Sequence, residues 1–262
     1  MAVLQGKCAL VTGSVAGLGF AMADGLAAAG ANLVLNGLCT AEEGAAAAAR
    51  IQAAHGVEAV FDPADLRDVG AIEAMMQGAA DRFGGVDVLV NNAVVRTFAP
   101  VDELAAKDWD DALAVNVSAA FHTVRLALPG MKANGWGRIL NLSSVYGQRG
   151  DVNRVGYVVA KSALIGLTRA VALETATHGV TCNALAPGSV PTPAILGKLD
   201  AMAAAAGADR AEIERDYLLE RHPTGRFVAM ENVAALAVFL CGPAGADITG
   251  ALLPVDGGWT AR

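Results

Sequence analysis

Three side chains in this sequence could together handle a proton on a substrate oxygen: Ser144, Tyr157 and Lys161. A free phenol titrates near pH ~10, which is too high for a ready base at neutral pH. Lys161 follows Tyr157 by four residues, so on a helix both side chains lie on one face, one turn apart. The ammonium group then stabilises the phenolate and lowers the pKa of Tyr157. Ser144 would hydrogen-bond the reacting oxygen and hold it near the phenol.

A glycine pattern near the N-terminus predicts the partner of this chemistry. Gly13, Gly17 and Gly19 follow a short apolar run and open a helical stretch. Glycines let a backbone turn tightly and approach a pyrophosphate, and the helix N-terminus then offers unpaired N–H groups to the phosphates. The spacing is G-x3-G-x-G rather than the common G-x-G-x-x-G, but its strand–turn–helix context favours a dinucleotide site over a structural turn. With the proton-handling set, this predicts an enzyme that exchanges an alcohol for a carbonyl against a nicotinamide.

The elements that must position these residues alternate along the chain. Seven apolar runs read as strands: Cys8–Thr12, Asn32–Asn36, Val57–Phe61, Val86–Val90, Arg138–Leu142, Thr181–Leu185 and Ala251–Val255. Helical stretches such as 18–29, 41–55 and 68–83 separate them. This rhythm predicts a single-domain, Rossmann-type α/β fold: a doubly wound parallel sheet of seven strands with helices on both faces. Such a sheet binds its ligand at the carboxyl ends of the strands, and each motif follows one of them.

One segment breaks the rhythm. Between Pro187 and Met230 the sequence contains no strand, only helical stretches at 194–206 and 208–221. Its length predicts a helical substrate flap over roughly residues 190–225, inserted in a single domain spanning 1–262. The alternative is a surface insertion that only packs.

Composition excludes several other classes of protein. The chain has 262 residues, is 54% hydrophobic and carries a net charge of −7, with no basic run, so no nucleic-acid partner is expected. No apolar run approaches the ~18 residues of a membrane span, and no secretory segment precedes the first strand, so we expect a cytoplasmic protein without a membrane partner. The four cysteines and four histidines show no metal-ligand spacing, so no metal site is expected.

Several motifs in order resemble one family. They are Thr12–Gly19, Asn91-Asn92-Ala93, Asn116, Ser144, Tyr157-x3-Lys161 and Pro187-Gly188-x-Val190-x-Thr192. Together they resemble the short-chain dehydrogenase/reductase family over the whole chain. The resemblance implies a nicotinamide-dependent oxidoreductase that assembles as a homotetramer. It also implies catalytic roles for Asn116, which supports a water that relays the proton, and for Ser144, Tyr157 and Lys161. Lys161 would in addition bind the nicotinamide ribose.

The same resemblance implies which residues contact the cofactor. These are Gly13, Ser14, Gly17, Leu18, Gly19, Leu38, Asp65, Leu66, Asn92, Ala93, Tyr157, Lys161, Pro187, Gly188, Val190 and Thr192. The second strand ends in Asn36-Gly37-Leu38, and Ala16 stands within the glycine turn, so neither position offers a cation to a 2′-phosphate. NAD is therefore favoured over NADP.

Substrate choice is where the resemblance weakens. Within the family the chain is similar to the bacterial D-3-hydroxybutyrate dehydrogenases, which oxidise a small hydroxy acid with NAD. At the positions that grip the carboxylate there, this chain has Arg96 for glutamine, Tyr146 for histidine, Arg154 for lysine, Ser189 for tryptophan and Lys198 for glutamine. Val94 also replaces the last glycine of the usual Asn-Asn-Ala-Gly. The predicted substrate contacts are Arg96, Ser144, Tyr146, Arg154, Ser189 and Lys198. The cations favour a polar or anionic hydroxy or keto substrate, and losing the tryptophan favours a larger one.

Two other functions remain open from the sequence. One is a reductase that uses NADPH on a 3-oxoacyl or bulkier keto compound. The other is a non-catalytic cofactor-binding protein, against which the retention of Ser144, Tyr157 and Lys161 argues.

Overall fold

A computed structural model describes residues 2–261 of the chain, and Met1 and Arg262 lie outside the described residues. The centre of the molecule is one parallel sheet whose strands follow the spatial order β3-β2-β1-β4-β5-β6-β7. The strands are β1 (Cys8–Val11), β2 (Asn32–Asn36), β3 (Ala59–Asp62), β4 (Val88–Asn91), β5 (Gly137–Leu142), β6 (Val180–Pro187) and β7 (Leu252–Val255). This confirms the predicted seven-stranded sheet. The strand order reverses between β1 and β4, which is the switch point where such folds bind ligands.

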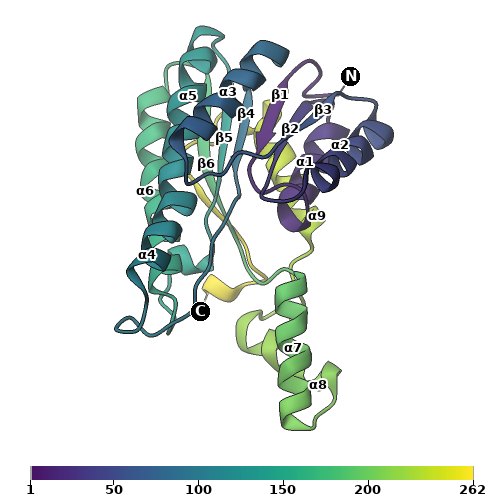
Figure 1. Cartoon of the computed structure of the whole chain (residues 1–262), viewed down its shortest axis with the longest axis vertical. Helices are drawn as coiled ribbons and strands as arrows, with labels where there is room; N and C mark the ends of the chain where they lie inside the picture. The colour runs from purple at the N-terminus through teal and green to yellow at the C-terminus, as the bar shows by residue number, and fades with distance from the viewer. Residues whose placement is uncertain (1, 262) are drawn as a thin grey trace.

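Helices cover both faces of the sheet, as predicted (Figure 1). The longer helices are α1 (Gly17–Ala28), α2 (Ala41–His55), α3 (Val69–Phe83), α4 (Ala106–Leu113), α5 (Ala119–Ala133), α6 (Val155–Thr175), α7 (Pro193–Ala206), α8 (Arg210–Arg221) and α9 (Met230–Cys241). In Figure 1, α1, α2 and α9 lie on one side of the sheet, and α3, α4, α5 and α6 lie on the other.

The two faces of each central strand feed two separate hydrophobic cores. In β1, Ala9 and Val11 belong to the core beneath α1, α2 and α9, while Cys8 and Leu10 belong to the core beneath α3 and α5. Successive side chains of a strand point to opposite faces, so an uninterrupted apolar run is what a doubly covered strand requires. This explains why the sequence shows continuous apolar runs instead of alternation, and it makes the strand ends rigid supports for a site.

Helix α6 is long and strongly apolar. By length and composition alone it is the one helix, among residues 2–261, that could cross a membrane. Half of its most apolar window is buried inside the protein, and Leu164, Thr168, Val171 and Ala172 are among its buried residues. Its apolar character therefore has a local explanation, since the helix packs on β5 and β6.

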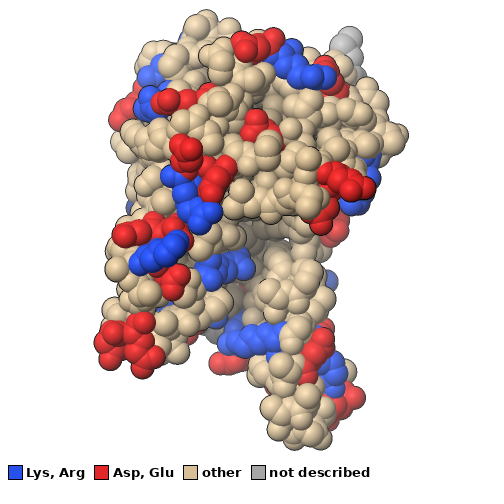
Figure 2. All heavy atoms as spheres, in the orientation of Figure 1, with Lys and Arg blue, Asp and Glu red and all other residues tan. Residues whose placement is uncertain are grey.

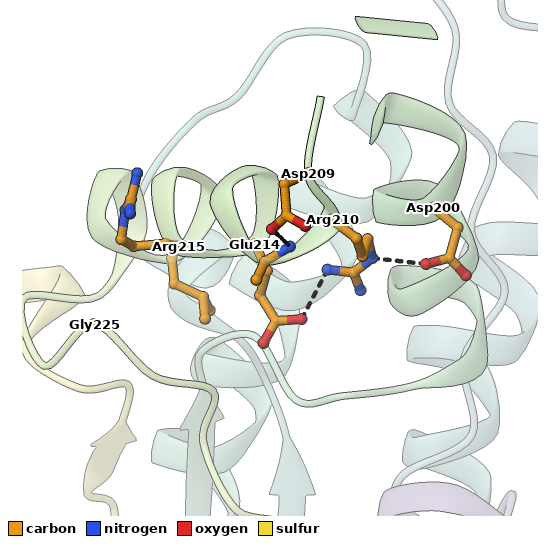
Figure 3. Close-up of a pocket in the computed structure, with 8 residues that line it drawn as sticks. Asp200, Asp209, Arg210, Glu214, Arg215 and Gly225 are labelled. Atoms are coloured by element: carbon orange, nitrogen blue, oxygen red, sulfur yellow. Dashed lines mark hydrogen bonds and ion pairs between the residues drawn. The ribbon is translucent and has the colours of Figure 1, made fainter. Parts of the chain in front are cut away.

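The segment after β6 leaves the main body as two helices, α7 and α8 (Figure 1). An arginine joins them: Arg210 Nε lies 2.6 Å from Asp200 Oδ1 on α7, and Arg210 Nη1 lies 2.9 Å from Glu214 Oε2 on α8 (Figure 3). Thr192 caps the start of α7, and Asp209 caps the start of α8. The pair is thus a small helical unit with its own caps and its own ionic link.

Candidate active site

The glycine turn between β1 and α1 is braced by the residues that follow β4. Asn92 Nδ2 donates to the carbonyl oxygens of Thr12 and Gly13, each at 2.9 Å. The Thr12 hydroxyl accepts the N–H groups of Asn92 and Ala93 at 2.9 and 3.0 Å. A Cβ atom added to Gly19 would lie 2.2 Å from the Gly13 carbonyl oxygen, so this turn closes only with glycine there.

The start of α1 is free to receive an anion. Its N-cap residue, Ala16, makes no capping hydrogen bond, and the first turn contains no acidic residue. Gly17 has a positive φ and faces open space. Unpaired N–H groups and the positive end of the helix dipole therefore face a cavity of about 310 Å³. Its lining includes Gly13, Gly17, Leu18, Gly19, Asn92, Ala93, Val94, Tyr157, Lys161, Pro187, Gly188, Val190 and Thr192.

Four of the residues expected to contact the cofactor do not line this cavity. Ser14 is fully buried, and its hydroxyl donates to the Val11 carbonyl at 2.6 Å and accepts the Asn36 N–H at 3.1 Å. The Ser14 side chain therefore holds β1 to β2. Leu38 is exposed after β2, Asp65 pairs with Arg67, and Leu66 is buried in the core. Their contacts with a cofactor stay predictions.

Ser144, Tyr157 and Lys161 come together at the carboxyl end of β5. Ser144 is the N-cap of the short 3₁₀ helix η2 (Val145–Gly147), and Tyr157 and Lys161 lie on α6. The Lys161 ammonium nitrogen lies 5.6 Å from the Tyr157 ring centroid and donates to the Leu142 carbonyl at 2.5 Å. In return, the Ser143 hydroxyl donates to the Lys161 carbonyl at 2.8 Å. These bonds fix α6 to the end of β5 at the turn of α6 that carries Tyr157 and Lys161.

The surroundings of Tyr157 favour its phenolate. Burial opposes ionisation, but the charges of Lys161 and Arg96 and hydrogen bonds with Ser144 and Arg96 outweigh it, so the pKa of Tyr157 lies below the usual phenol value. Burial likewise lowers the pKa of Lys161, against the attraction of Tyr157. Tyr146 behaves oppositely, because burial raises its pKa to about 12. Tyr157 is therefore suited to proton transfer, whereas Tyr146 stays a neutral phenol.

Asn116 lies in an element that sequence reasoning missed. It sits in η1 (Ala114–Ser118), a π-helical turn between α4 and α5. Its amide pairs with the backbone of one residue: Oδ1 accepts the Val95 N–H at 2.8 Å, and Nδ2 donates to the Val95 carbonyl at 2.9 Å. Asn116 thus clamps the loop that follows β4. Its expected part in a proton relay stays a prediction.

A second cavity of about 690 Å³ opens beside the first, between the main body and the α7–α8 pair. Figure 2 shows a hollow in this region with blue, basic side chains at its margin. All six predicted substrate residues line the cavity: Arg96, Ser144, Tyr146, Arg154, Ser189 and Lys198. Sequence reasoning missed several other lining residues, among them Phe98, Asp151, Tyr217, Arg221 and Trp259. The tertiary placement of α8 and of the C-terminal turn brings the last three in, and no local motif marks them.

The cations of this cavity differ in how far they are neutralised. Arg154 Nε lies 2.7 Å from Asp151 Oδ2, and its guanidinium stacks near the rings of Phe98 and Tyr146. Much of its charge is therefore already paired. Among residues 2–261, neither Arg96 nor Lys198 forms a salt bridge. These two are the cations best placed to meet an incoming anion.

Comparisons with known proteins agree with this geometry. The family model described as short chain dehydrogenase matches residues 7–204. The D-beta-hydroxybutyrate dehydrogenase of Cupriavidus necator is 43% identical over 99% of this chain and 100% of its own. The enzyme of the same name from Rhizobium meliloti is 41% identical over 98% of this chain and 99% of its own. Among solved structures, L-sorbose reductase from Gluconobacter frateurii, complexed with NADPH and L-sorbose, aligns over both whole chains with a TM-score of 0.95 at 29% identity.

Proposed function

The chain belongs to the short-chain dehydrogenase family and is an oxidoreductase of alcohol and ketone groups, and from this we propose that it uses NAD to interconvert a hydroxy acid and the matching keto acid. One observation carries the proposal: Ser144 and Tyr157 line both cavities. They stand where the glycine-turn cavity meets the cation-lined one. A substrate carbon held at that junction would lie between the cofactor and the acid–base group.

The glycine-turn cavity fits a dinucleotide. The uncapped start of α1 and the open space at Gly17 suit a pyrophosphate, and the residues after β6 would hold the nicotinamide end. When bound, the nicotinamide would accept or supply the hydride.

The end of β2 supports NAD over NADP. Leu38 is exposed there, and the start of α2 is already capped by Thr40 and Glu43. This helix end therefore carries a carboxylate and offers no arginine or lysine to a 2′-phosphate.

In the proposed mechanism, Tyr157 is the general base and acid. In oxidation its phenolate takes the proton of the substrate hydroxyl, and in reduction its phenol returns that proton. The Ser144 hydroxyl donates a hydrogen bond to the reacting oxygen, and the Lys161 ammonium stabilises the phenolate. Asn116 holds the neighbouring loop and, as the family resemblance implies, supports the water that carries the proton away.

The second cavity supports an anionic substrate larger than a four-carbon acid. Its volume of about 690 Å³ falls within the range that encloses drug-sized ligands. Arg96 and Lys198 would attract the substrate carboxylate, and the rings of Tyr146, Tyr217 and Trp259 would cover apolar parts of the substrate. The α7–α8 pair would act as the flap over this substrate.

Activity assays test the proposal directly. Purified protein is given NAD or NADP with pairs of secondary alcohols that share a skeleton but differ by one carboxylate, and reduced nicotinamide is followed by absorbance. We expect faster turnover with NAD and with the hydroxy acids. A clear preference for NADP and neutral polyols would instead favour the alternative function, an NADPH-dependent reductase. L-sorbose reductase, which shares the fold, was solved with NADPH and L-sorbose. If wild type and Tyr157→Phe were equally inert across the panel, a non-catalytic binding protein would be the better description.

We also propose that the enzyme is a cytoplasmic homotetramer. Exposed apolar side chains on α5 and α6, namely Phe121, Val159 and Leu173, support burial between copies of the chain. The cysteines among residues 2–261 are all free, which suits a reducing compartment. Sedimentation equilibrium gives the number of copies directly.

A further inference from the structure

Arg96 occupies an unusual place, because it faces the proton-transfer group as well as the substrate cavity. It lies on the loop after β4 and lines both cavities. Its guanidinium carbon lies 5.2 Å from the centroid of the Tyr157 ring, and its side chain hydrogen-bonds that of Tyr157. The distance from Lys161 Nζ to the same centroid is 5.6 Å. The phenol therefore has two cations at similar distances, one from its own helix and one from the loop after β4.

The loop that carries Arg96 is held on both sides of the arginine. Asn116 fixes Val95, the residue immediately before it, through two hydrogen bonds. Three residues further on, the Ala99 N–H donates to the Asn153 carbonyl at 3.2 Å. The backbone under Arg96 is thus tied to η1 and to the segment before α6. This fixes the backbone position from which the Arg96 side chain reaches Tyr157, although Arg96 is itself solvent-exposed.

The other groups around Tyr157 do not cancel this second charge. The charged or titratable groups that face the phenol are Lys161 from α6, Arg96 from the β4 loop and Tyr146 from η2, whose ring centroid is 6.1 Å away. Tyr146 stays neutral at ordinary pH because burial raises its pKa to about 12. Asp151 acts on Tyr146 and is paired with Arg154. Among residues 2–261, these two cations are the only groups that act on Tyr157 by charge.

We propose that Arg96 is a positioning residue for proton transfer, a second cation that stabilises the phenolate of Tyr157 together with Lys161. The proposal rests on the proposed role of Tyr157 as base. It adds that, before the substrate binds, Arg96 helps to set the pH at which Tyr157 becomes a phenolate. Substrate and cofactor would exclude water from the junction of the cavities and strengthen the interaction.

The protein contains three tyrosines, Tyr146, Tyr157 and Tyr217, so each can be followed by carbon-13 NMR after labelling of the tyrosine ring. In the wild type we expect one signal to titrate below the ordinary phenol range, and Tyr157→Phe should remove it. Arg96→Gln should raise the midpoint of this signal by about one pH unit, a value discounted for the exposure of the arginine. Arg96→Lys keeps the charge and should restore most of the shift. Lys198→Gln removes another cation of the same cavity and should leave the midpoint unchanged.

Kinetics give an independent readout. In oxidation, log kcat/KM rises with pH as Tyr157 loses its proton, so Arg96→Gln should move this acid limb upward by the same interval, for a neutral alcohol as well as for a hydroxy acid. At a fixed pH below the limb this is roughly a tenfold loss.

In the NMR titration, three results would overturn the proposal: an unchanged Tyr157 midpoint in Arg96→Gln, no rescue by Arg96→Lys, or an equal shift in Lys198→Gln. A loss confined to KM for hydroxy acids, with the limb in place, would also overturn it and leave Arg96 a substrate anchor only. The proposed function fails separately, if Tyr157→Phe retains full activity with every substrate turned over.

Discussion

The two walls of the candidate site are built in different ways. One wall carries Ser144 and Lys161, which are 5% and 3% exposed, on elements packed into the core. The other wall is the α7–α8 pair, in which only Leu199, Ala203 and Leu218 are buried. Hydrogen bonds through Leu142 and Ser143 fix the first wall to β5, whereas an ion pair at Arg210 joins the helices of the second. A buried wall can hold reacting groups in position, and an exposed one can change its contacts without loss of the fold.

This difference separates the reaction from the choice of substrate. The buried wall would perform a proton transfer common to all alcohols, and the exposed wall would select among them. Substitutions on the buried wall should therefore reduce kcat for every substrate. Substitutions on the exposed wall should change KM, and only for substrates with the matching charge.

The largest effect is expected for Tyr157→Phe. The phenylalanine ring fits the same buried place but has no hydroxyl to exchange a proton, so kcat should fall by about 10²- to 10⁴-fold with every substrate. Binding of reduced cofactor, followed by fluorescence, should persist because the glycine turn is untouched. A variant that lost cofactor binding to the same degree would show that the tyrosine acts mainly by packing.

Ser144→Ala should have the next largest effect. It removes a hydrogen-bond donor to the reacting oxygen, so we expect kcat to fall by about 10²-fold, the lower end of what such donors contribute. Ser144 also accepts the Tyr146 N–H at 3.3 Å as the cap of η2, so a stability cost of about 1 kcal/mol should accompany the change. Steady-state rates measure the fall in kcat, and thermal melting measures the loss of stability. Ser143→Ala is the comparison for positioning: it removes the neighbouring hydroxyl and its bond to the Lys161 carbonyl but leaves the Ser144 donor in place, so any fall in kcat that it causes measures a loosened wall.

On the exposed wall, Lys198→Gln should change binding more than turnover. Lys198 lines the substrate cavity without a salt bridge among residues 2–261, so its ammonium can pair with a substrate carboxylate. Partial exposure reduces such a pair to about 1 kcal/mol, or roughly a fivefold rise in KM for hydroxy acids. The uncharged alcohol of each pair should be unaffected. Lys132→Gln, a change of the same kind on α5, should move neither value, and an equal rise there would attribute the effect to net charge.

The contrast between the walls also marks what could be predicted from the sequence. The strands and the α6 pair Tyr157 and Lys161 were predictable because their signals are local: apolar runs for strands and a four-residue spacing for one helix face. The expected substrate residues also proved to line one cavity, since each follows a strand end or lies on the segment after β6.

Other parts of the site depend on contacts between distant segments. The pairing of Arg154 with Asp151 depends on the turn between η2 and α6. Tyr217, Arg221 and Trp259 enter the cavity only through the packing of α8 and the C-terminal turn. The π-helical turn at Asn116 has no periodic pattern to reveal it, since one extra residue in a helix leaves both flanking patterns intact. None of these features has a spacing that could be read from the sequence.

The smallest effect is expected where the exposed wall is held together. Arg210→Gln removes the link between Asp200 on α7 and Glu214 on α8 (Figure 3). Because the pair is exposed, its loss should not unfold the protein. It should make amides of α7 and α8 exchange with solvent roughly two- to fivefold faster, with kcat unchanged. Arg215→Gln on the same helix is the control, since within the described residues 2–261 Arg215 pairs only with its neighbour Asp216, at 3.4 Å, and bridges no helices. Hydrogen exchange resolves the difference by segment. If β5 and α6 exchanged faster as well, the two walls would form one cooperative unit, and their separation into a reaction wall and a selection wall would be wrong.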